Sequence, residues 1–270
     1  MASKISDIWV HTTVLIENDW GERGTGFFVS APLPYDEGQS RVFIVTNKHV
    51  LNKDPKLRDQ AEWVNLGLNV KSNGETMGKD LQYPVKCDNG RPAWHGHPYA
   101  DVDVLAIDAT YLVHQVAGLS FMHAVYSAFA NAEVMKRSRI TFGDEIVVVG
   151  YPLGLKQGLT NYPLVRQGML ATSPEQNLYD ESTGQTLRGF LIDGATVPGS
   201  SGSPVLLKPT VKIDPDEGLT ETASWLLGIV AETRYSPTRT PTGHVTSYTG
   251  LGLAFHADTI KETIEPMLSW

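Results

Sequence analysis

The chain has very little cysteine: one residue, Cys87, among 270. A single thiol cannot form an intrachain disulfide, which excludes a disulfide-stapled secreted scaffold and is typical of a reducing compartment. No apolar run approaches the roughly 20 residues of a membrane span. The stretch before Asp19 also lacks the apolar core and cleavage site of a secretory leader. We therefore expect a cytoplasmic protein that does not bind membranes.

Positive charge is scarce as well. The 22 Lys and Arg residues stand against 30 Asp and Glu, so the formal net charge is −8. A field of this sign repels the phosphates of nucleic acids, and we expect no nucleic-acid partner. With 41% hydrophobic and 19% charged residues, the composition is that of a globular domain and excludes a disordered or fibrous chain.

Short runs rich in β-branched and aromatic residues dominate the chain, and clusters of Gly, Pro, Asn and Asp separate them. The runs cover 8–16, 41–46, 102–107, 145–150, 189–192, 204–207, 225–231 and 251–255. Strands at this spacing, without a helix between each pair, favour antiparallel barrels or sandwiches. Apolar residues at helical spacing predict one helix over 121–137 and a second over 258–268. Surface loops are expected at 32–39, 52–59, 209–222 and 236–243.

Three short motifs occur in the order histidine, aspartate, serine. His49 follows a predicted strand, Asp103 stands at the acidic start of another, and Ser201 lies in a small-residue turn, PGSSGSP. A serine hydroxyl becomes a nucleophile when a base takes its proton, and imidazole, with a pKa of about 6.5, suits that role. A carboxylate then holds the imidazole in one tautomer. The glycines allow backbone N–H groups to converge on a developing oxyanion.

Six segments of the chain carry a family resemblance. They are GTGFF (24–28), IVTNKHV (44–50), VDVLAI (102–107), the stretch 143–154, DGATVPGSSGSP (193–204), and the last strand with its helix (252–268). In this order they resemble the chymotrypsin-fold serine proteases, most closely the bacterial HtrA (Deg-type) protease domains, without the PDZ module of many members. The resemblance implies a mostly β fold of two antiparallel six-stranded barrels.

The resemblance also implies how the chain is divided. The whole chain, 1–270, would be one protease domain. Its N-terminal barrel would span 1–120, a linker with a helix 121–140, and the C-terminal barrel with its closing helix 141–270.

Carried over residue by residue, the resemblance assigns the catalytic roles. It implies Ser201 as the nucleophile, His49 as general base and then acid, and the backbone amides of Gly199 and Ser201 as the oxyanion hole. For the triad acid it favours Asp103, because four apolar residues follow as in the family's strand. Asp101 is the alternative.

The same positions imply a substrate pocket, lined by Ala195, Ala231, Glu232, Thr233 and Gly252. No aspartate stands at its base to pair with Lys or Arg. We therefore expect a small or medium apolar residue before the scissile bond. Glu232 at the rim is the feature that would instead recruit a cation.

The leading function is thus a serine endopeptidase that acts on a protein or peptide through an acyl-enzyme. The alternative is a binding or regulatory protein on a protease fold, inactive until an activating partner docks near 209–222 and 236–243. An α/β-hydrolase esterase is disfavoured. It requires the order serine, acid, histidine and a second glycine where Ser203 stands, whereas His49 precedes the serine in this chain. No cofactor or metal is expected, since His95 and His97 have no further ligand cluster nearby. The sequence makes no prediction of the oligomeric state.

Overall fold

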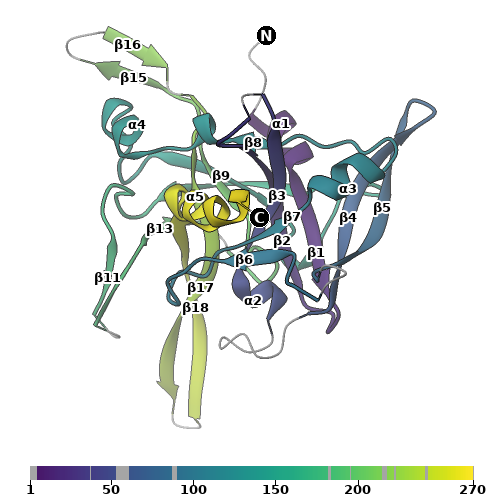
Figure 1. The fold of residues 1–270 in the computed structure, drawn as a ribbon. Helices are drawn as coiled ribbons and strands as arrows, with labels where there is room; N and C mark the ends of the chain where they lie inside the picture. Colours follow the sequence, from purple (N-terminus) through teal and green to yellow (C-terminus); the bar gives the residue numbers. More distant parts are fainter. Residues whose placement is uncertain are drawn as a thin grey trace.

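The computed structural model describes residues 5–36, 38–52, 61–86, 90–181, 184–194, 196–214, 218–221, 223–240 and 243–269. Cys87, Ala195 and most of the loop predicted at 52–59 lie outside these residues. Figure 1 shows the first half of the chain and the second half as two β units, with the C-terminal helix near the middle. The fold is mostly β, as the sequence predicts.

The first half forms one curled sheet with the strand order β5-β4-β1-β2-β3-β7-β6, and β8 pairs with β2. Its strands are β1 (Thr13–Asn18), β2 (Arg23–Pro32), β3 (Ser40–Thr46), β4 (Trp63–Ser72), β5 (Glu75–Pro84), β6 (Trp94–Gly96), β7 (Leu105–Asp108) and β8 (Ala124–Val125). Beyond the ends of β5 and β6, the sheet edges meet at an isolated bridge between Lys86 and Pro92. Pro84 and Pro92 have no N–H to donate, which limits pairing between these edges. Among the described residues, which exclude 87–89, no ladder joins β5 to β6, so the six-stranded barrel predicted for this half is not confirmed.

The second half is a closed barrel with the strand order β10-β13-β18-β17-β14-β9. Its strands are β9 (Glu145–Gly150), β10 (Leu164–Leu170), β13 (Gly189–Asp193), β14 (Pro204–Leu207), β17 (Leu226–Thr240) and β18 (Gly243–His256). The six-stranded barrel predicted for this half is confirmed. Gly and Pro separate its strands, while β-branched and aliphatic residues fill its interior.

Two stretches predicted as loops are hairpins. Within 209–222 the strands β15 (Val211–Asp214) and β16 (Gly218–Glu221) pair antiparallel. The stretch 236–243 contains the outer ends of β17 and β18, whose ladder extends to the pair Thr240–Gly243. Figure 1 shows this long hairpin projecting from the barrel. A further small hairpin joins β11 (Leu178–Asp180) to β12 (Gln185–Leu187). In these stretches backbone pairing overrides the turn-rich composition on which the loop prediction depended.

The helices are short. They are α1 (Ile5–Thr12), α2 (Lys48–Leu51), α3 (Thr110–Gln115), α4 (Ala132–Arg137) and α5 (Ala257–Ile264), with 3₁₀ turns η1 (Tyr126–Ala128), η2 (Pro152–Gly154) and η3 (Glu265–Ser269). The predicted C-terminal helix is confirmed as α5 with its 3₁₀ extension η3. In the described part of the chain, no helix is long and apolar enough to cross a membrane.

The helix predicted over 121–137 is wrong except for α4. The chain before α4 runs through β8 and η1 instead, because its two aromatic side chains serve different cores. Phe121 packs against Phe28 on the first sheet, with ring centroids 5.1 Å apart. Phe129 is buried in the core between the two halves. An extended chain can reach both sites, whereas a helix would stack the two rings on one face.

The strand predicted over 8–16 is also half wrong, because its first part belongs to α1. The hydroxyl of Thr13 donates to the carbonyl of Trp9 at 2.7 Å, a bond of helical spacing that suits a β-branched residue at a helix end. The Trp9 ring then packs edge-on against Phe27, with centroids 6.2 Å apart. Tertiary packing of Trp9 therefore decides the local structure.

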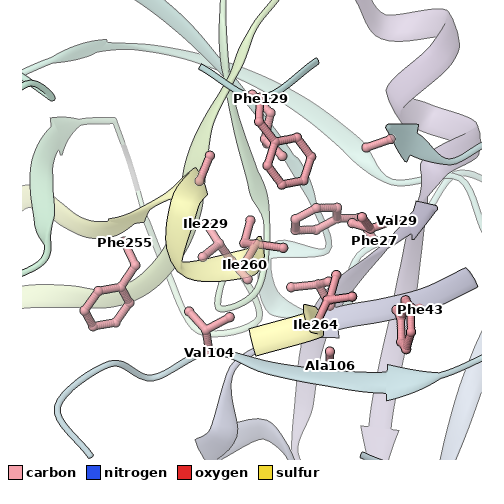
Figure 2. Close-up of a cluster of buried hydrophobic side chains, with 14 of the residues drawn as sticks. Phe27, Val29, Phe43, Val104, Ala106, Phe129, Ile229, Phe255, Ile260 and Ile264 are labelled. Atoms are coloured by element: carbon pink, nitrogen blue, oxygen red, sulfur yellow. The ribbon is translucent and has the colours of Figure 1, made fainter. Parts of the chain in front are cut away.

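One apolar core joins the two halves. Figure 2 shows Phe27 and Phe43 from the first sheet facing Ile229 and Phe255 from the barrel, with Ile264 of α5 among them. Each of these five residues is at most 2% exposed to solvent. Because both halves bury apolar surface in this shared core, their relative position is set by packing and not by the linker alone.

We predict that Ile264→Ala destabilises the whole fold. Ile264 is fully buried, so its truncation should lower the free energy of unfolding by about 2–5 kcal/mol, measured by urea denaturation. Leu159→Ala is the matched control, because that side chain is 92% exposed, and a change below about 0.5 kcal/mol is expected there. Equal effects of the two substitutions would show that α5 contributes little to the shared core.

Candidate active site

His49 and Asp103 form a tightly bonded pair. His49 lies in α2, directly after β3, and Asp103 precedes β7, the strand beside β3. The His49 Nδ1 lies 2.5 Å from Asp103 Oδ2, and the His49 backbone N–H donates to Asp103 Oδ1 at 3.1 Å. Asn47 Nδ2 donates to the Asp103 backbone carbonyl at 2.6 Å. Both carboxylate oxygens thus bond to His49, and Asp103 rather than Asp101 is its acidic partner.

Opposing effects act on the pKa of His49. Burial of the ring lowers it, but the hydrogen bond and charge of Asp103, aided by the charges of Glu22 and Glu232, raise it further than burial lowers it. The net result is a pKa above the ordinary value of about 6.5. Protonated His49 therefore stabilises the folded state below about pH 6.5, and this contribution is lost as the pH rises through the raised pKa.

Lys48 fixes the loop that carries Asp103. Its Nζ donates to the carbonyls of His97 and Tyr99 at 2.8 and 2.9 Å. The lysine stem passes Gly96, where a Cβ would lie 3.1 Å from Lys48 Cε. Burial lowers the pKa of Lys48, opposed by the charges of Asp103 and Asp101. No sequence pattern distinguishes Lys48 as a site residue, because only the folded chain shows which carbonyls its ammonium meets.

Ser201 faces the same cleft as His49. The cleft has a volume of about 530 Å³, and His49, Asp103 and Ser201 all border it. The Ser201 hydroxyl donates to the carbonyl of Ala231 at 3.2 Å. The backbone carbonyl of Ser201 accepts from the Thr25 N–H at 2.8 Å. Within the described residues, no hydrogen bond joins this hydroxyl to the imidazole. The structure therefore brings the three side chains to one cleft, with the serine turned toward Ala231.

The turn before Ser201 leaves two backbone amides unused. The Pro198 carbonyl accepts from the Leu153 N–H at 2.7 Å. Because the peptide bond is trans, the Gly199 N–H points in the opposite direction. Neither the Gly199 nor the Ser201 N–H donates a hydrogen bond to any described residue, whereas the Ser200 N–H donates to Val197. Gly199 adopts φ +89°, and a Cβ there would lie 2.3 Å from the Tyr151 carbonyl oxygen, so only glycine fits.

Comparison with known proteins identifies the family. Residues 24–210 match the trypsin-like peptidase domain. The chain belongs to the trypsin-like peptidase family. It is accordingly a serine protease, as the sequence motifs predict.

Solved structures similar to this peptidase share little sequence with it. One is the inactive form of the Rv3671c protease, with 15% identity and a TM-score of 0.47 over 96% of this chain and 89% of that one. Another is an inactive mutant of Rv3671c from Mycobacterium tuberculosis H37Rv, with 16% identity and a TM-score of 0.45 over 97% and 88%. No curated protein matches the sequence of the peptidase significantly.

Part of the expected substrate pocket of the peptidase borders the cleft. Ala231, Glu232 and Thr233 do so, together with apolar side chains of Leu187, Val197, Pro198, Leu253 and Phe255. Gly252 instead faces Thr196, whose Cγ2 would lie 2.5 Å from a Cβ at that glycine. Residues alternate sides along β18, so Leu253 and not Gly252 reaches the cleft. Ala195 lies outside the described residues.

Glu232 is already paired. Arg234 NH1 lies 3.2 Å from a Glu232 carboxylate oxygen and 3.4 Å from Asp180 Oδ2. The positive charge of Arg234, which Asp180 shares, offsets part of the negative charge of Glu232 at the cleft rim. The pairing weakens the attraction of Glu232 for a cationic substrate side chain.

His95 and His97, at and just after β6, both contact residues of α5. His97 Nε2 lies 3.0 Å from Glu262 Oε2, and Arg188 bonds both Glu262 oxygens, at 2.5 and 2.6 Å. His95 Nδ1 lies 3.2 Å from the Thr263 carbonyl. Across the described ranges, no group of three or more His, Cys, Asp or Glu side chains could hold a metal ion.

We predict that Asp103→Asn lowers the pKa of His49. The substitution removes the charge that opposes burial, so the imidazole should lose its proton at lower pH than in the wild-type peptidase. An NMR titration of the His49 ring, assigned with a His49→Gln variant, measures the shift. Asp101→Asn is the matched control: its carboxylate acts on Lys48, and the His49 pKa should stay at its wild-type value. A shift in Asp101→Asn as large as in Asp103→Asn would contradict the assignment of the acidic partner.

Proposed function

We propose that this serine protease is an endopeptidase that works through a triad of Ser201, His49 and Asp103. The observation that carries the proposal is that His49 makes two hydrogen bonds to the Asp103 carboxylate, through its backbone N–H and its Nδ1. Both residues border the cleft that Ser201 also borders. A carboxylate bonded to Nδ1 holds the proton on that nitrogen and leaves Nε2 as the acceptor. This is the arrangement that activates a serine hydroxyl.

The first step would begin with a rotation of Ser201 about its Cα–Cβ bond, from the Ala231 carbonyl toward His49 Nε2. Staggered side-chain rotamers differ by such rotations at low cost. The hydroxyl oxygen then bonds to the substrate carbonyl carbon, its proton passes to Nε2, and the carbonyl electrons move to the oxygen. The C–N bond breaks next, and Nε2 returns the proton to the leaving amine. Water repeats the sequence on the acyl-enzyme and restores the serine.

The developing negative charge needs donors that are already oriented. The unused amides of Gly199 and Ser201 are suited to this, since they require no reorganisation when the charge forms. The bond from the Leu153 N–H to the Pro198 carbonyl supports their orientation. We propose these two amides as the oxyanion hole.

We infer one protease domain over 1–270, in which the curled first sheet is the counterpart of a first barrel and the closed barrel is the second. The triad histidine and aspartate come from the first unit and the serine from the second. The shared core between the units supports this reading, since it gives the cleft rigid walls.

One observation favours a second candidate, a protease that is inactive until a partner docks. The Ser201 hydroxyl is turned toward Ala231 rather than His49. In this alternative a partner protein bound near the β15–β16 or β17–β18 hairpin would release the serine. The two candidates differ in whether the isolated chain reacts with a serine-directed reagent.

We predict that Ser201→Ala abolishes turnover. Cleavage of fluorescently labelled casein should fall by a factor on the order of 10⁴–10⁶, because the nucleophile is lost while the fold stays intact. A fluorophosphonate should label the wild-type chain and not this variant.

Ser203→Ala is the matched control, since the buried Ser203 hydroxyl has no hydrogen-bond partner within the described residues. It should keep both labelling and cleavage. Labelling of Ser201→Ala at the wild-type rate would refute Ser201 as the nucleophile. A folded wild-type chain that the reagent does not label would favour the partner-activated alternative.

We predict cleavage after small or medium apolar residues. Apolar side chains border the cleft, and Arg234 offsets the charge of Glu232. Cleavage-site profiling on a peptide library measures the preference. Arg234→Gln should raise the share of Lys and Arg before the scissile bond, because it frees the Glu232 carboxylate. A dominant Lys or Arg preference in the wild type would overturn the prediction.

A further inference from the structure

Thr25 connects the first sheet to the turn that holds Ser201. It lies in β2 and is fully buried. Its hydroxyl donates to the Gly199 carbonyl at 2.8 Å and accepts from the Tyr151 N–H at 3.0 Å. Its backbone N–H donates to the Ser201 carbonyl at 2.8 Å. One residue from the first half thus bonds to the carbonyls of Gly199 and Ser201 in the second half.

These bonds fix the peptide planes around the two unused amides. The Leu153 N–H holds the Pro198 carbonyl and so sets the plane that contains the Gly199 N–H. The Thr25 hydroxyl holds the next plane through the Gly199 carbonyl. With both planes fixed, Gly199 stays at φ +89°, and its N–H keeps its direction. Without the Thr25 hydroxyl, the peptide plane between Gly199 and Ser200 would lose the hydrogen bond that holds it to the first half of the chain.

The backbone packs closely around Thr25 and the serine turn, and a Cβ on Gly150 would lie 2.9 Å from the Thr25 hydroxyl oxygen. A Cβ on Gly202 would lie 1.9 Å from the Thr25 carbonyl oxygen, and one on Gly199 would lie 2.3 Å from the Tyr151 carbonyl oxygen. The hydroxyl uses its proton and a lone pair at once, so a side chain of the same shape without oxygen satisfies neither neighbour. Serine would keep both bonds and lose only the methyl group.

We propose that Thr25 is a positioning residue for the oxyanion hole: its hydroxyl, supplied by the first half of the chain, orients the Gly199 amide in the second. The inference rests on the proposed function, because the amides matter only if an oxyanion forms there. It implies that correct seating of β2 against the serine turn is a condition for catalysis and not only for folding.

The test compares Thr25→Val and Thr25→Ser with the wild type. The readouts are the second-order rate of fluorophosphonate labelling and the kcat and KM for labelled casein. Thr25→Val should lower the labelling rate and kcat by about 10–100-fold, with KM changed less than about threefold, because loss of one oxyanion donor typically costs about 10²–10³-fold. Thr25→Ser should stay within about threefold of the wild type in all three.

Thr263→Val is the matched control for the loss of a buried threonine hydroxyl. Thr263 is fully buried in α5, and its hydroxyl donates to the Thr259 carbonyl at 2.7 Å, away from the serine turn. Urea denaturation shows whether the variants lose similar stability. A merely structural role for Thr25 would leave the labelling rate of folded Thr25→Val equal to that of Thr263→Val.

The outcomes separate the inference from the proposed function. A wild-type chain that is folded but neither labelled nor active contradicts the proposed function. An active wild type with Thr25→Val as active as Thr263→Val refutes the role of Thr25 alone. Impairment of Thr25→Ser equal to that of Thr25→Val refutes the hydroxyl as the cause. If Thr25→Val does not fold, Thr25→Ala against Thr25→Ser isolates the hydroxyl, and equal labelling rates of that pair overturn the inference.

Discussion

The shared apolar core between the two β units is the constraint on which the site depends. Each unit has a core of its own, but Phe27 and Phe43 of the first and Ile229 and Phe255 of the second pack together with α5. His49 and Asp103 come from one unit and Ser201 from the other. Close packing resists small relative shifts of the units, since a gap of less than one ångström already forfeits much of the dispersion energy. The distance across the cleft is therefore set by hydrophobic burial in this core, and Phe255 belongs both to the core and to the wall of the cleft.

Polar bonds, those of Thr25 across the junction and those of Lys48 within the first unit, set directions rather than distances. Thr25, from the first unit, bonds to the carbonyls of Gly199 and Ser201, while Lys48 bonds to the loop that precedes Asp103. These groups are buried or half-buried, where a lost partner costs more than it would in water. The pKa of His49 follows from the same balance: burial favours the neutral ring, and the Asp103 carboxylate favours the charged one. The core and the polar bonds together hold the imidazole against the Asp103 carboxylate, in the cleft that Ser201 also borders.

The strands that could be predicted from the sequence are those buried along their length. EIVVVG is apolar after Glu145 and PVLL is apolar throughout, and β9 and β14 have the predicted bounds, 145–150 and 204–207. By contrast, β4 and β5 were not predicted: Asn65, Gly67 and Asn69 interrupt the apolar residues of the largely buried β4, and β5 is exposed at most of its residues and has no apolar run. The helix over 121–137 failed because Phe121 and Phe129 pack in different cores, which the spacing of apolar residues does not reveal.

The sequence alone determined the family and the residue types of the site. His49, Asp103 and Ser201 stand beside apolar strands in an order that matches one protease fold, and a local motif survives in the sequence whatever surrounds it. Only the tertiary structure decided which groups orient them. Thr25 and Gly199 are 174 residues apart, and a hydrogen bond over that separation leaves no periodicity or spacing to read. The direction of a carbonyl is likewise a property of the folded backbone, because every residue carries the same peptide group.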